Sequence, residues 1–396
     1  MKILAIGGSG GMGRFAVDAV QHLDSVEQIV VADLNEVSAR GFAAQLNSKV
    51  KAIGLDVNDG AALRKAMADT DLVMNTCGPF FLHAVHVLQA AIETGCHYLD
   101  ICDDWEPTLE MLALDQKAKD AGVSATVGLG ASPGISSMLA LIAMRELDSC
   151  STVYTGWDFG GATPESESSQ AGVNAAMLHG IEQMTGKVKI FRNSSYELTK
   201  PLGPITVRLP GLKPFRGHIF GHPEALTFPY NYPHLHESIN LAHGGDIDSW
   251  LLKGILGLVN RGLVSRARAA ALLTWFEGQR VLDVEKANAD SLPAMYGVAI
   301  GAKDAEPASV GAAWIGEAAD RGTETELSMG AATGIPLACG AQFLLDGRIE
   351  QKGVFTPEAG HIDPLEFLTE VFSQYEASGK LASGALEDNV RISRSW

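Results

Sequence analysis

The sequence predicts an α/β protein that begins with a doubly wound parallel sheet and continues into a second domain. Three observations support this. Short apolar strands alternate with amphipathic helices over the first 130 residues, and a glycine-rich turn directly follows the first strand. In addition, 46% of the 396 residues are hydrophobic, which is enough for two cores. Strands that recur with helices between them need right-handed crossovers, and these produce a parallel sheet.

The elements of the first domain follow one another in regular order. Strands are expected at residues 2–6, 28–32, 50–55, 72–75, 97–101 and 124–127. Helices are expected at residues 14–23, 37–46, 61–68, 83–94 and 109–121. Gly95 and Gly122 end two of these helices, because glycine readily adopts the left-handed conformation of a helix terminus. This alternation is typical of the Rossmann fold, which binds dinucleotides.

The turn Gly8-x-Gly10-x-x-Gly13 predicts where the dinucleotide binds. It opens a helix, so a pyrophosphate would meet free backbone N–H groups at the positive helix end. Asp33 lies 20 residues after Gly13 at a strand end, where an acid accepts hydrogen bonds from a ribose diol. Its carboxylate would repel a 2′-phosphate, which favours NAD; NADP would be tolerated if Arg40 folded back. The cofactor contacts expected here are Gly8, Ser9, Gly10, Gly11, Met12, Gly13, Asp33 and Leu34.

Two further strand ends belong to the same crevice, because ligands of open parallel sheets bind at the carboxyl ends of strands. Asp56 and Val57 follow the third strand, where the adenine edge usually lies in this fold. The residues expected to line the nicotinamide ribose follow the fourth strand: Asn75, Thr76, Cys77, Gly78 and Pro79. The alternative for these positions is that they form ordinary loops.

Composition excludes several classes of partner. A net charge of −17 would repel both a nucleic-acid backbone and an anionic membrane surface. The most apolar later stretch, residues 250–276, is interrupted by basic residues and gives no membrane span. The five cysteines form no C-x-x-C pair, and their odd number argues against a disulfide framework. Because the chain also starts without a signal-peptide pattern, a cytoplasmic protein is expected.

Several segments of the chain resemble the saccharopine dehydrogenase-like oxidoreductases. This group includes saccharopine reductase, lysine 6-dehydrogenase and carboxynorspermidine dehydrogenase. The similar segments are residues 71–81 (DLVMNTCGPFF), 95–100 (GCHYLD), 130–138 (GASPGISSM), 333–336 (TGIP) and 341–353 (AQFLLDGRIEQKG). The middle of the chain resembles the family only faintly.

The resemblance implies a shared architecture. Residues 1–130 would form the Rossmann domain, residues 131–332 an inserted α+β domain for substrate binding and dimerisation with an antiparallel sheet, and residues 333–396 a segment that returns to the Rossmann domain. The pattern of the middle region agrees with this. Strands are expected at residues 151–159, 188–191, 205–209 and 323–329, helices at 171–185 and 249–280, and a turn at 316–321. The apolar middle domain would supply the self-complementary face of a homodimer.

The resemblance also implies imine reduction and its reverse, with hydride transfer at a carbon bonded to nitrogen in amino-acid metabolism. The substrate would be a small molecule with an amine and a carboxylate. Asp100, Asp103 and Asp104, within and after the fifth strand, are catalytic candidates, because a carboxylate stabilises an iminium. His97 is a further candidate. The alternatives are that Asp100 caps a helix, that the Asp pair forms a solvated acidic turn, and that His97 is structural.

Residues 216–236 concentrate histidine, tyrosine and proline, and predict a substrate loop. His218 and His222 are acid–base candidates, and Glu224 belongs to a stretch that resembles part of the family's substrate pocket. Glycines beside both histidines disfavour a helix that would display them together, and cysteine or carboxylate partners at fixed spacing are missing, so no metal site is expected. An aromatic-rich connection without function is the alternative.

Three arginines, Arg192, Arg208 and Arg216, are candidates for binding the substrate carboxylate. The chain has Ser132 where members that form saccharopine often have Asp before Pro-Gly, so saccharopine itself is a doubtful substrate. Two other functions remain open: reduction of a C=O or C=C group, and NAD(H) sensing without catalysis.

Overall fold

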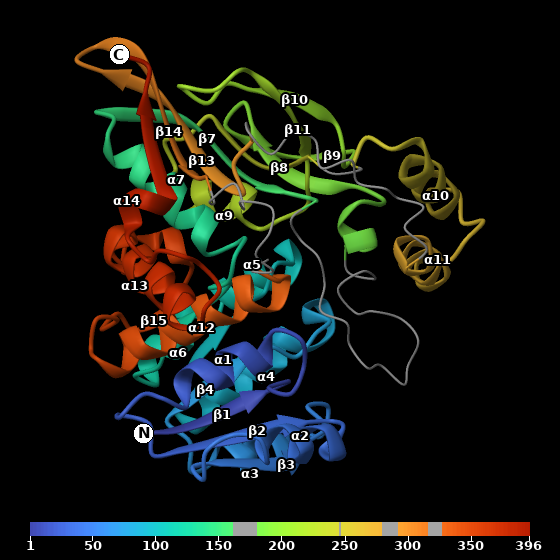
Figure 1. Ribbon diagram of the computed structural model, residues 1–396, viewed down its shortest axis with the longest axis vertical. Coiled ribbons are helices and arrows are strands. Elements are labelled where there is room, and N and C mark those ends of the chain that lie inside the picture. Colours follow the sequence, from blue (N-terminus) through green and yellow to red (C-terminus); the bar gives the residue numbers. More distant parts are fainter. Residues whose placement is uncertain (161–179, 245–246, 279–291, 316–326) are drawn as a thin grey trace. The chain divides into compact units, whose positions relative to one another are not determined.

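The computed structural model describes residues 1–160, 180–244, 247–278, 292–315 and 327–396 (Figure 1). These residues form two compact units. The first combines Met1–Ile135 with Met329–Gly384, and the second combines Ser136–Ser328 with Ala385–Trp396. The last residues of the chain therefore lie in the second unit, whereas the sequence predicts that all of residues 333–396 return to the first.

The first unit is built on a seven-stranded parallel sheet with the order β15-β6-β5-β4-β1-β2-β3. Its strands are β1 (Lys2–Ile6), β2 (Gln28–Asp33), β3 (Val50–Gly54), β4 (Leu72–Asn75), β5 (His97–Asp100), β6 (Ser124–Thr126) and β15 (Gly353–Phe355). Strand order reverses direction between β1 and β4, which is the switch point where ligands bind in doubly wound sheets. The predicted Rossmann fold is confirmed.

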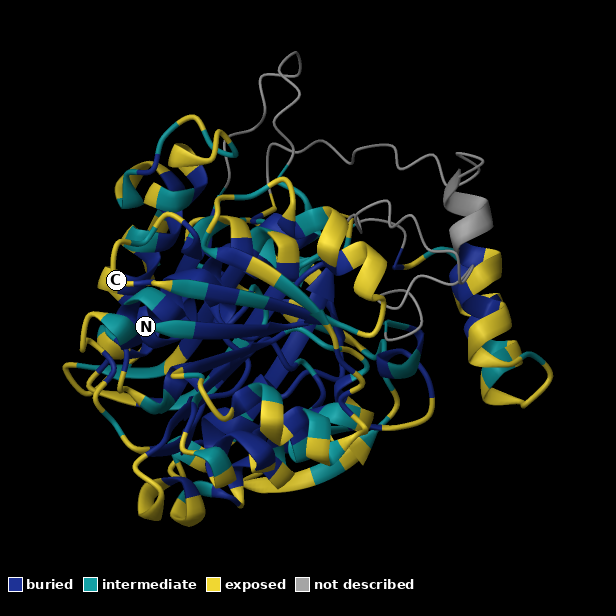
Figure 2. Ribbon diagram, turned by 90° about the horizontal axis from the view of Figure 1, so that it is seen from below, coloured by how far each residue is buried: buried dark blue, intermediate teal, exposed yellow. Residues whose placement is uncertain are grey.

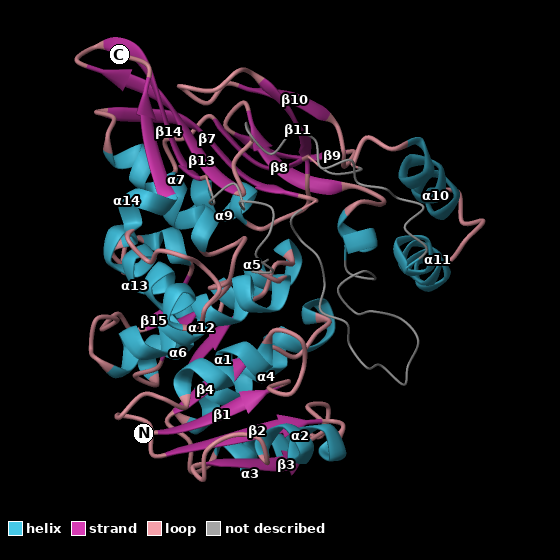
Figure 3. Ribbon diagram, viewed as in Figure 1, coloured by secondary structure: helices cyan, strands magenta, loops and turns pink. Residues whose placement is uncertain are grey.

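Helices accompany these strands (Figure 3), and those up to α6 follow the order that the sequence predicts. They are α1 (Gly13–Val20), α2 (Glu36–Ala43), α3 (Gly60–Met67), α4 (Phe80–Thr94), α5 (Trp105–Leu112), α6 (Asp115–Asp120), α12 (Met329–Leu345), the 3-10 helix η1 (Pro357–Ala359) and α13 (Pro364–Ala377). Side chains cap several of them: the Asp59 carboxylate, for example, accepts the Ala61 and Ala62 N–H groups. One helix expected at residues 109–121 is two helices, α5 and α6, separated at residues 113–114.

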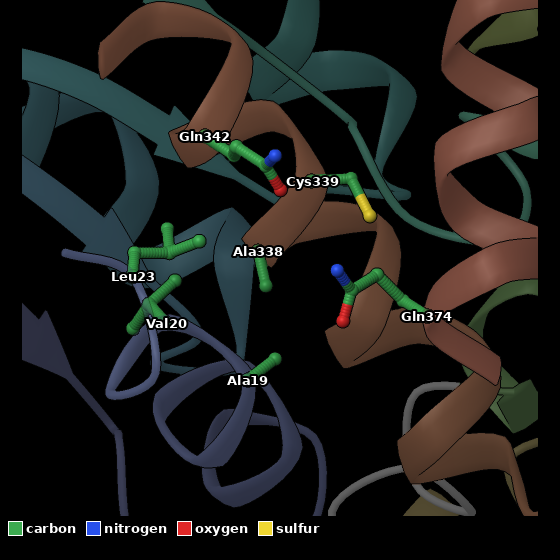
Figure 4. Close-up of a pocket in the computed structure, with 7 residues that line it drawn as sticks. All are labelled: Ala19, Val20, Leu23, Ala338, Cys339, Gln342 and Gln374. Carbon is green, nitrogen blue, oxygen red and sulfur yellow. The ribbon is translucent and has the colours of Figure 1, made fainter. Parts of the chain in front are cut away.

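Helix α12 forms part of the core of the first unit. It is apolar all round and mostly buried, as expected of a helix covered on every side. Gly334 lets it approach α1 closely, because a Cβ at this position would lie 2.3 Å from the Met12 carbonyl oxygen. The void left among α1, α12 and α13 has a volume of only about 10 Å³ (Figure 4), which is too small to hold a substrate.

The second unit contains a mixed sheet. Its main order is β10-β11-β12-β7-β13-β14-β16, with β8 paired to β12 and β9 to β8. The strands are β7 (Ser149–Asp158), β8 (Val188–Arg192), β9 (Ser195–Thr199), β10 (Pro204–Val207), β11 (Phe215–Ile219), β12 (Glu237–His243), β13 (Met295–Lys303), β14 (Glu306–Trp314) and β16 (Val390–Arg394). Most pairs are antiparallel, as expected, but β7 and β12 run parallel.

The helices of the second unit are α7 (Ile135–Arg145), α9 (Glu224–Asn231), α10 (Trp250–Asn260), α11 (Arg266–Gly278) and α14 (Leu386–Asn389). The helix predicted at residues 249–280 is thus two helices with a turn at residues 261–265, and residues 279–280 lie outside the described part. So do residues 171–179 of another predicted helix, the turn at 316–321 and residues 323–326 of a predicted strand. Met329, the last residue of that strand prediction, begins α12 instead.

The strands in the middle of both sheets are largely buried, whereas β9, β10 and β16 are more exposed, and many helices expose one face (Figure 2). Among the described residues, no helix is long and apolar enough to cross a membrane.

Candidate functional site

The glycine-rich turn between β1 and α1 has the shape of a pyrophosphate cradle. Its third glycine, Gly13, fits only because it lacks a side chain: a Cβ there would lie 2.4 Å from the Gly7 carbonyl oxygen and 2.6 Å from Thr76 Oγ1. A Cβ on Gly10, in contrast, would meet only the Gly7 carbonyl oxygen, at 3.2 Å, and would otherwise project into open space. This open side lies at the first turn of α1, so a dinucleotide pyrophosphate fits there.

Asp33, which the sequence predicts to bind the adenine ribose, lies at the end of β2. One carboxylate oxygen accepts the Ser9 hydroxyl at 2.6 Å, and the other accepts the Asn35 N–H at 3.1 Å. The carboxylate is therefore fixed beside the glycine-rich turn, at the place where the sequence predicts contact with a ribose diol. Leu34, the next residue, is 77% exposed and leaves this side open.

The turn after β4, which the sequence predicts to line the nicotinamide ribose, is hydrogen-bonded to the first strand. The Thr76 hydroxyl and N–H both donate to the Ile6 carbonyl oxygen. Burial, followed by the charges of Asp33 and Asp56, raises the pKa of the Cys77 thiol to about 11. This thiol therefore stays protonated at neutral pH, and it acts as a small half-buried side chain rather than as a nucleophile.

A buried hydrogen-bond network joins the carboxyl ends of β4, β5 and β6. Asn75 donates to the Tyr98 hydroxyl at 2.9 Å, and this hydroxyl donates to Asp100 Oδ2 at 2.8 Å. Asp100 Oδ1 accepts the N–H groups of Cys102, at 3.0 Å, and of Gly128, at 2.7 Å. Burial raises the pKa of the Asp100 carboxyl to about 6 despite these hydrogen bonds.

This network fixes the turn that borders the nicotinamide side. Asn75 Oδ1 also accepts the Cys77 N–H at 3.1 Å, so the chain of hydrogen bonds reaches that turn. Sequence reasoning considered Asp100 as a charge that stabilises an iminium or as a helix cap, and it did not predict the network that joins Asp100 to Tyr98 and Asn75. The sequence did contain a signal for this network: a polar residue ends each of the two adjacent strands. Asn75 ends β4 and Asp100 ends β5, and the two residues lie opposite each other in the strand register.

The predicted catalytic residues of the first unit occupy different places. Asp104 is 5% exposed, and its carboxylate accepts the Phe81 N–H at 3.1 Å in the first turn of α4. Its neighbour Asp103 is half-buried. His97 lies at the amino end of β5, where its ring Nδ1 accepts the Ser124 N–H at 3.0 Å. Hence His97 is not near the turns at the carboxyl ends of the strands, whereas both aspartates follow such an end.

In the second unit, a buried polar cluster surrounds Glu224. This carboxylate is fully buried, and its Oε1 accepts the Ser136 hydroxyl at 2.8 Å and the Asn240 amide at 3.1 Å. Its Oε2 lies 3.7 Å from His222 Nδ1, and the His222 ring stacks on Trp157 with ring centroids 5.4 Å apart. A carboxylate and an aromatic ring therefore both lie next to the His222 imidazole, and the 3.7 Å separation from the carboxylate is longer than a hydrogen bond.

His218 contacts a different acidic residue, Asp248. Its Nε2 is 3.2 Å from Asp248 Oδ1, and burial lowers the pKa of its imidazole even though Asp248 opposes that shift. Lys253 and Arg216 also lie near Asp248, at 2.6 Å and 3.7 Å. Within the described residues, no group of three or more histidine, cysteine or acidic side chains is arranged to hold a metal ion.

The three arginines considered for a substrate carboxylate differ in their surroundings. Arg192 is bound by Glu197 and Glu237, and Arg216 lies near Asp248. Arg208 is exposed.

Comparisons with known proteins agree with the site in the first unit. Residues 3–126 match the family model of the saccharopine dehydrogenase NADP-binding domain. A saccharopine dehydrogenase (NADP(+), L-glutamate-forming) from Pyricularia oryzae is 32% identical over 163 residues, which is 41% of this chain and 34% of the relative. A carboxyaminopropylagmatine dehydrogenase from a Synechocystis species is 27% identical over 154 residues, covering 37% of this chain and 38% of that protein. The matches thus cover about a third of the length of these relatives.

Among solved structures, the apo saccharopine dehydrogenase (L-Glu forming) of Saccharomyces cerevisiae is similar over 100% of both chains, with a TM-score of 0.63 and 16% identity. At this identity the likeness shows a shared fold. The resemblance inferred from the sequence is therefore confirmed: residues 3–126 match an NADP-binding domain model of the saccharopine dehydrogenase type, and the chain shares the fold of a saccharopine dehydrogenase.

Proposed function

We propose that the chain is an NAD(P)-dependent oxidoreductase that acts on a CH–NH or CH–NH₂ group of an amino-acid, opine or polyamine-like substrate. One observation carries the proposal: the open cradle at Gly10 lies in a domain that matches the NADP-binding domain of saccharopine dehydrogenases. The names of two relatives, saccharopine dehydrogenase and carboxyaminopropylagmatine dehydrogenase, indicate the substrate class.

The residues that would hold the cofactor follow from the geometry. The N–H groups of the glycine-rich turn and the first turn of α1 would bind the pyrophosphate, and Asp33 would bind the adenine ribose. The turn Asn75–Pro79 would border the nicotinamide ribose. When bound, the nicotinamide supplies or accepts the hydride, while the protein orients the substrate carbon and manages protons.

Protons must move on the substrate side of this reaction. Oxidation of an amine leaves an iminium, and hydrolysis of the iminium consumes one water and yields a carbonyl compound and an amine. We propose that His222, oriented by Glu224, exchanges a proton with the substrate nitrogen or the attacking water. Asp103 is the corresponding candidate in the first unit, where its charge would stabilise the iminium. The buried Asp104 would position α4, and Asp100 the nearby turns.

A substrate screen that follows nicotinamide absorbance tests the reaction class. The forward arm offers lysine, saccharopine and diamines with NAD or NADP, and the reverse arm offers a 2-oxo acid or aldehyde plus an amine with NADH or NADPH. We expect oxidation of the reduced cofactor only when carbonyl and amine are both present. If reduction proceeds equally well without an amine, the chain reduces C=O or C=C groups instead. If the cofactor binds and no substrate reacts, a sensing role is favoured.

We further propose a cytoplasmic homodimer whose substrate also carries a carboxylate. All five cysteines are free thiols, which fits a reducing compartment. The hairpin of α10 and α11 exposes large apolar side chains, including Trp250 and Leu263, on the second unit. Exposed Arg208 is a candidate for the carboxylate. Sedimentation velocity should give twice the monomer mass, and a Trp250→Ser, Leu263→Ser double variant should shift it towards the monomer. A wild-type monomer would refute the dimer.

A further inference from the structure

Two residues of opposite charge lie beside the Ser9 peptide in the glycine-rich turn. On one side, the Ser9 hydroxyl donates to Asp33 Oδ2 at 2.6 Å. On the other, the guanidinium of Arg14 donates to the Ser9 carbonyl oxygen at 3.1 Å and to the Gly10 carbonyl oxygen at 3.4 Å. The turn that would hold the pyrophosphate therefore carries a fixed carboxylate and a cation next to each other.

The position of Arg14 places its charge on the adenosine side of the cradle. Its guanidinium carbon lies 6.0 Å above the ring centroid of Phe42, a residue of α2, which follows directly after β2 and Asp33. The side chain thus extends from α1 towards the β2–α2 connection. A group attached to the ribose near Asp33 would come close to this guanidinium, which presents several N–H donors suited to phosphate oxygens.

Arg14 is also freer to bind an anion than Arg40, the arginine that the sequence analysis considered for NADP. Arg40 is held by Glu36 one turn earlier in α2, and this ion pair neutralises it. Arg14 is exposed and hydrogen-bonded to carbonyl oxygens, and no acidic side chain in the described part of the chain forms an ion pair with it. Its full charge therefore remains to interact with a ligand.

We infer that Arg14 and Asp33 together set cofactor choice, with Asp33 binding the ribose diol of NAD(H) and Arg14 binding the 2′-phosphate of NADP(H), so that the domain accepts both. This inference rests on the dinucleotide site of the proposed function. It reconciles an acid at the end of β2, which favours NAD, with a domain whose family model is named for NADP. Ser9 links the two residues, because its hydroxyl holds Asp33 and its carbonyl holds Arg14.

Direct titration of the full chain with NADH and NADPH, followed by nicotinamide fluorescence, tests the inference without any substrate. The wild type should bind both. Arg14→Gln should raise the Kd for NADPH at least tenfold and change the Kd for NADH less than twofold, whereas Arg14→Lys should recover part of the loss. Asp33→Asn should raise the Kd for NADH and lower that for NADPH, because its amide keeps the position but removes the repulsive charge.

Arg40→Gln is the matched control, since it removes a neighbouring positive charge that is already paired with Glu36. Higher salt should weaken NADPH binding more than NADH binding in the wild type, and this difference should shrink in Arg14→Gln. Circular dichroism melts confirm that each variant is folded. A wild type that does not bind NADPH, equal losses for both dinucleotides in Arg14→Gln, or a selective loss in Arg40→Gln would overturn the inference. If neither dinucleotide binds the wild type, the proposed function fails as well.

Discussion

Replacement of Asp100 by Asn tests whether burial destabilises the ionised form of this carboxyl group in the network that joins β4, β5 and β6. The carboxylate is fully buried, and its pKa is raised from 3.8 to about 6. The raised value means that the folded state favours the protonated form. The stability that this group contributes is therefore fully present below pH 3.8 and is lost as the pH rises through 6.

The size of the effect follows from the pKa shift. One pH unit corresponds to about 1.4 kcal/mol, so a shift of about two units changes the free energy of unfolding by about 3 kcal/mol over the full range. Between about pH 4.5 and 7.5, roughly 2 kcal/mol of this is lost. The amide of the Asp100→Asn variant would not titrate. It would keep an oxygen for the two backbone N–H groups but would face the Tyr98 hydroxyl with a donor, at a constant cost of about 1–2 kcal/mol.

Urea denaturation of the wild type and Asp100→Asn at several pH values measures this difference. The wild type should be the more stable protein at pH 4.5, and its advantage should shrink or reverse by pH 7.5. Tyr98→Phe provides an internal check, because the Tyr98 hydroxyl lowers the pKa of Asp100 and its removal should move the transition to higher pH. If the two stability curves run parallel between these pH values, Asp100 does not titrate in this range and the reasoning is refuted.

Four further variants address the cradle and two acidic positions. Gly10→Val should abolish binding of both dinucleotides with little loss of melting temperature, since the added side chain enters the open space beside α1, and normal fluorescence titration would contradict the cradle. Gly13→Ala should lower the melting temperature as well, because its Cβ would meet the backbone at 2.4 Å; an unchanged melting curve would contradict the close approach. Asp104→Ala should destabilise the protein by about 1 kcal/mol through loss of the contact to the first turn of α4, and an unchanged urea midpoint would count against that role. If Glu224 orients His222, the Glu224→Gln variant should have a changed pH dependence of kcat and a KM close to that of the wild type. A pH dependence of kcat identical to that of the wild type would contradict this role.

The first unit could be predicted from the sequence because its signals are local. Strand and helix alternate with short connections, and the Gly8-Gly10-Gly13 spacing places the turn between them. One helix was predicted where the structure has two, because the hydrophobic periodicity continues from the first helix into the second. The helix expected at residues 109–121 divides into α5 and α6, since Leu114 adopts a backbone conformation outside the helical region. A hydrophobic pattern does not reveal such a break.

The second unit was less predictable because its sheet depends on contacts between residues far apart in the chain. Its strands β9, β11 to β14 and β16 were not expected. The parallel pairing of β7 with β12 joins residues about 85 positions apart, and no local pattern specifies that register. Residues 385–396 illustrate the same limit, because β16 pairs with β14 rather than joining the first unit.

The polar networks of both units follow one structural rule, although neither was predicted. In the first unit, the parallel register sets Asn75 opposite Asp100, and the network forms at the ends of these strands. In the second, the parallel pairing of β7 and β12 sets Thr155 opposite Asn240, and Asn240 donates both to Thr155 Oγ1 and to Glu224. In both units, parallel pairing sets polar residues of neighbouring strands opposite each other, so they find partners while remaining buried; in the first unit they end their strands, whereas in the second they lie within β7 and β12. A search for polar residues that end consecutive apolar runs would therefore have linked Asn75 to Asp100, but Asn240 required knowledge of which strands pair.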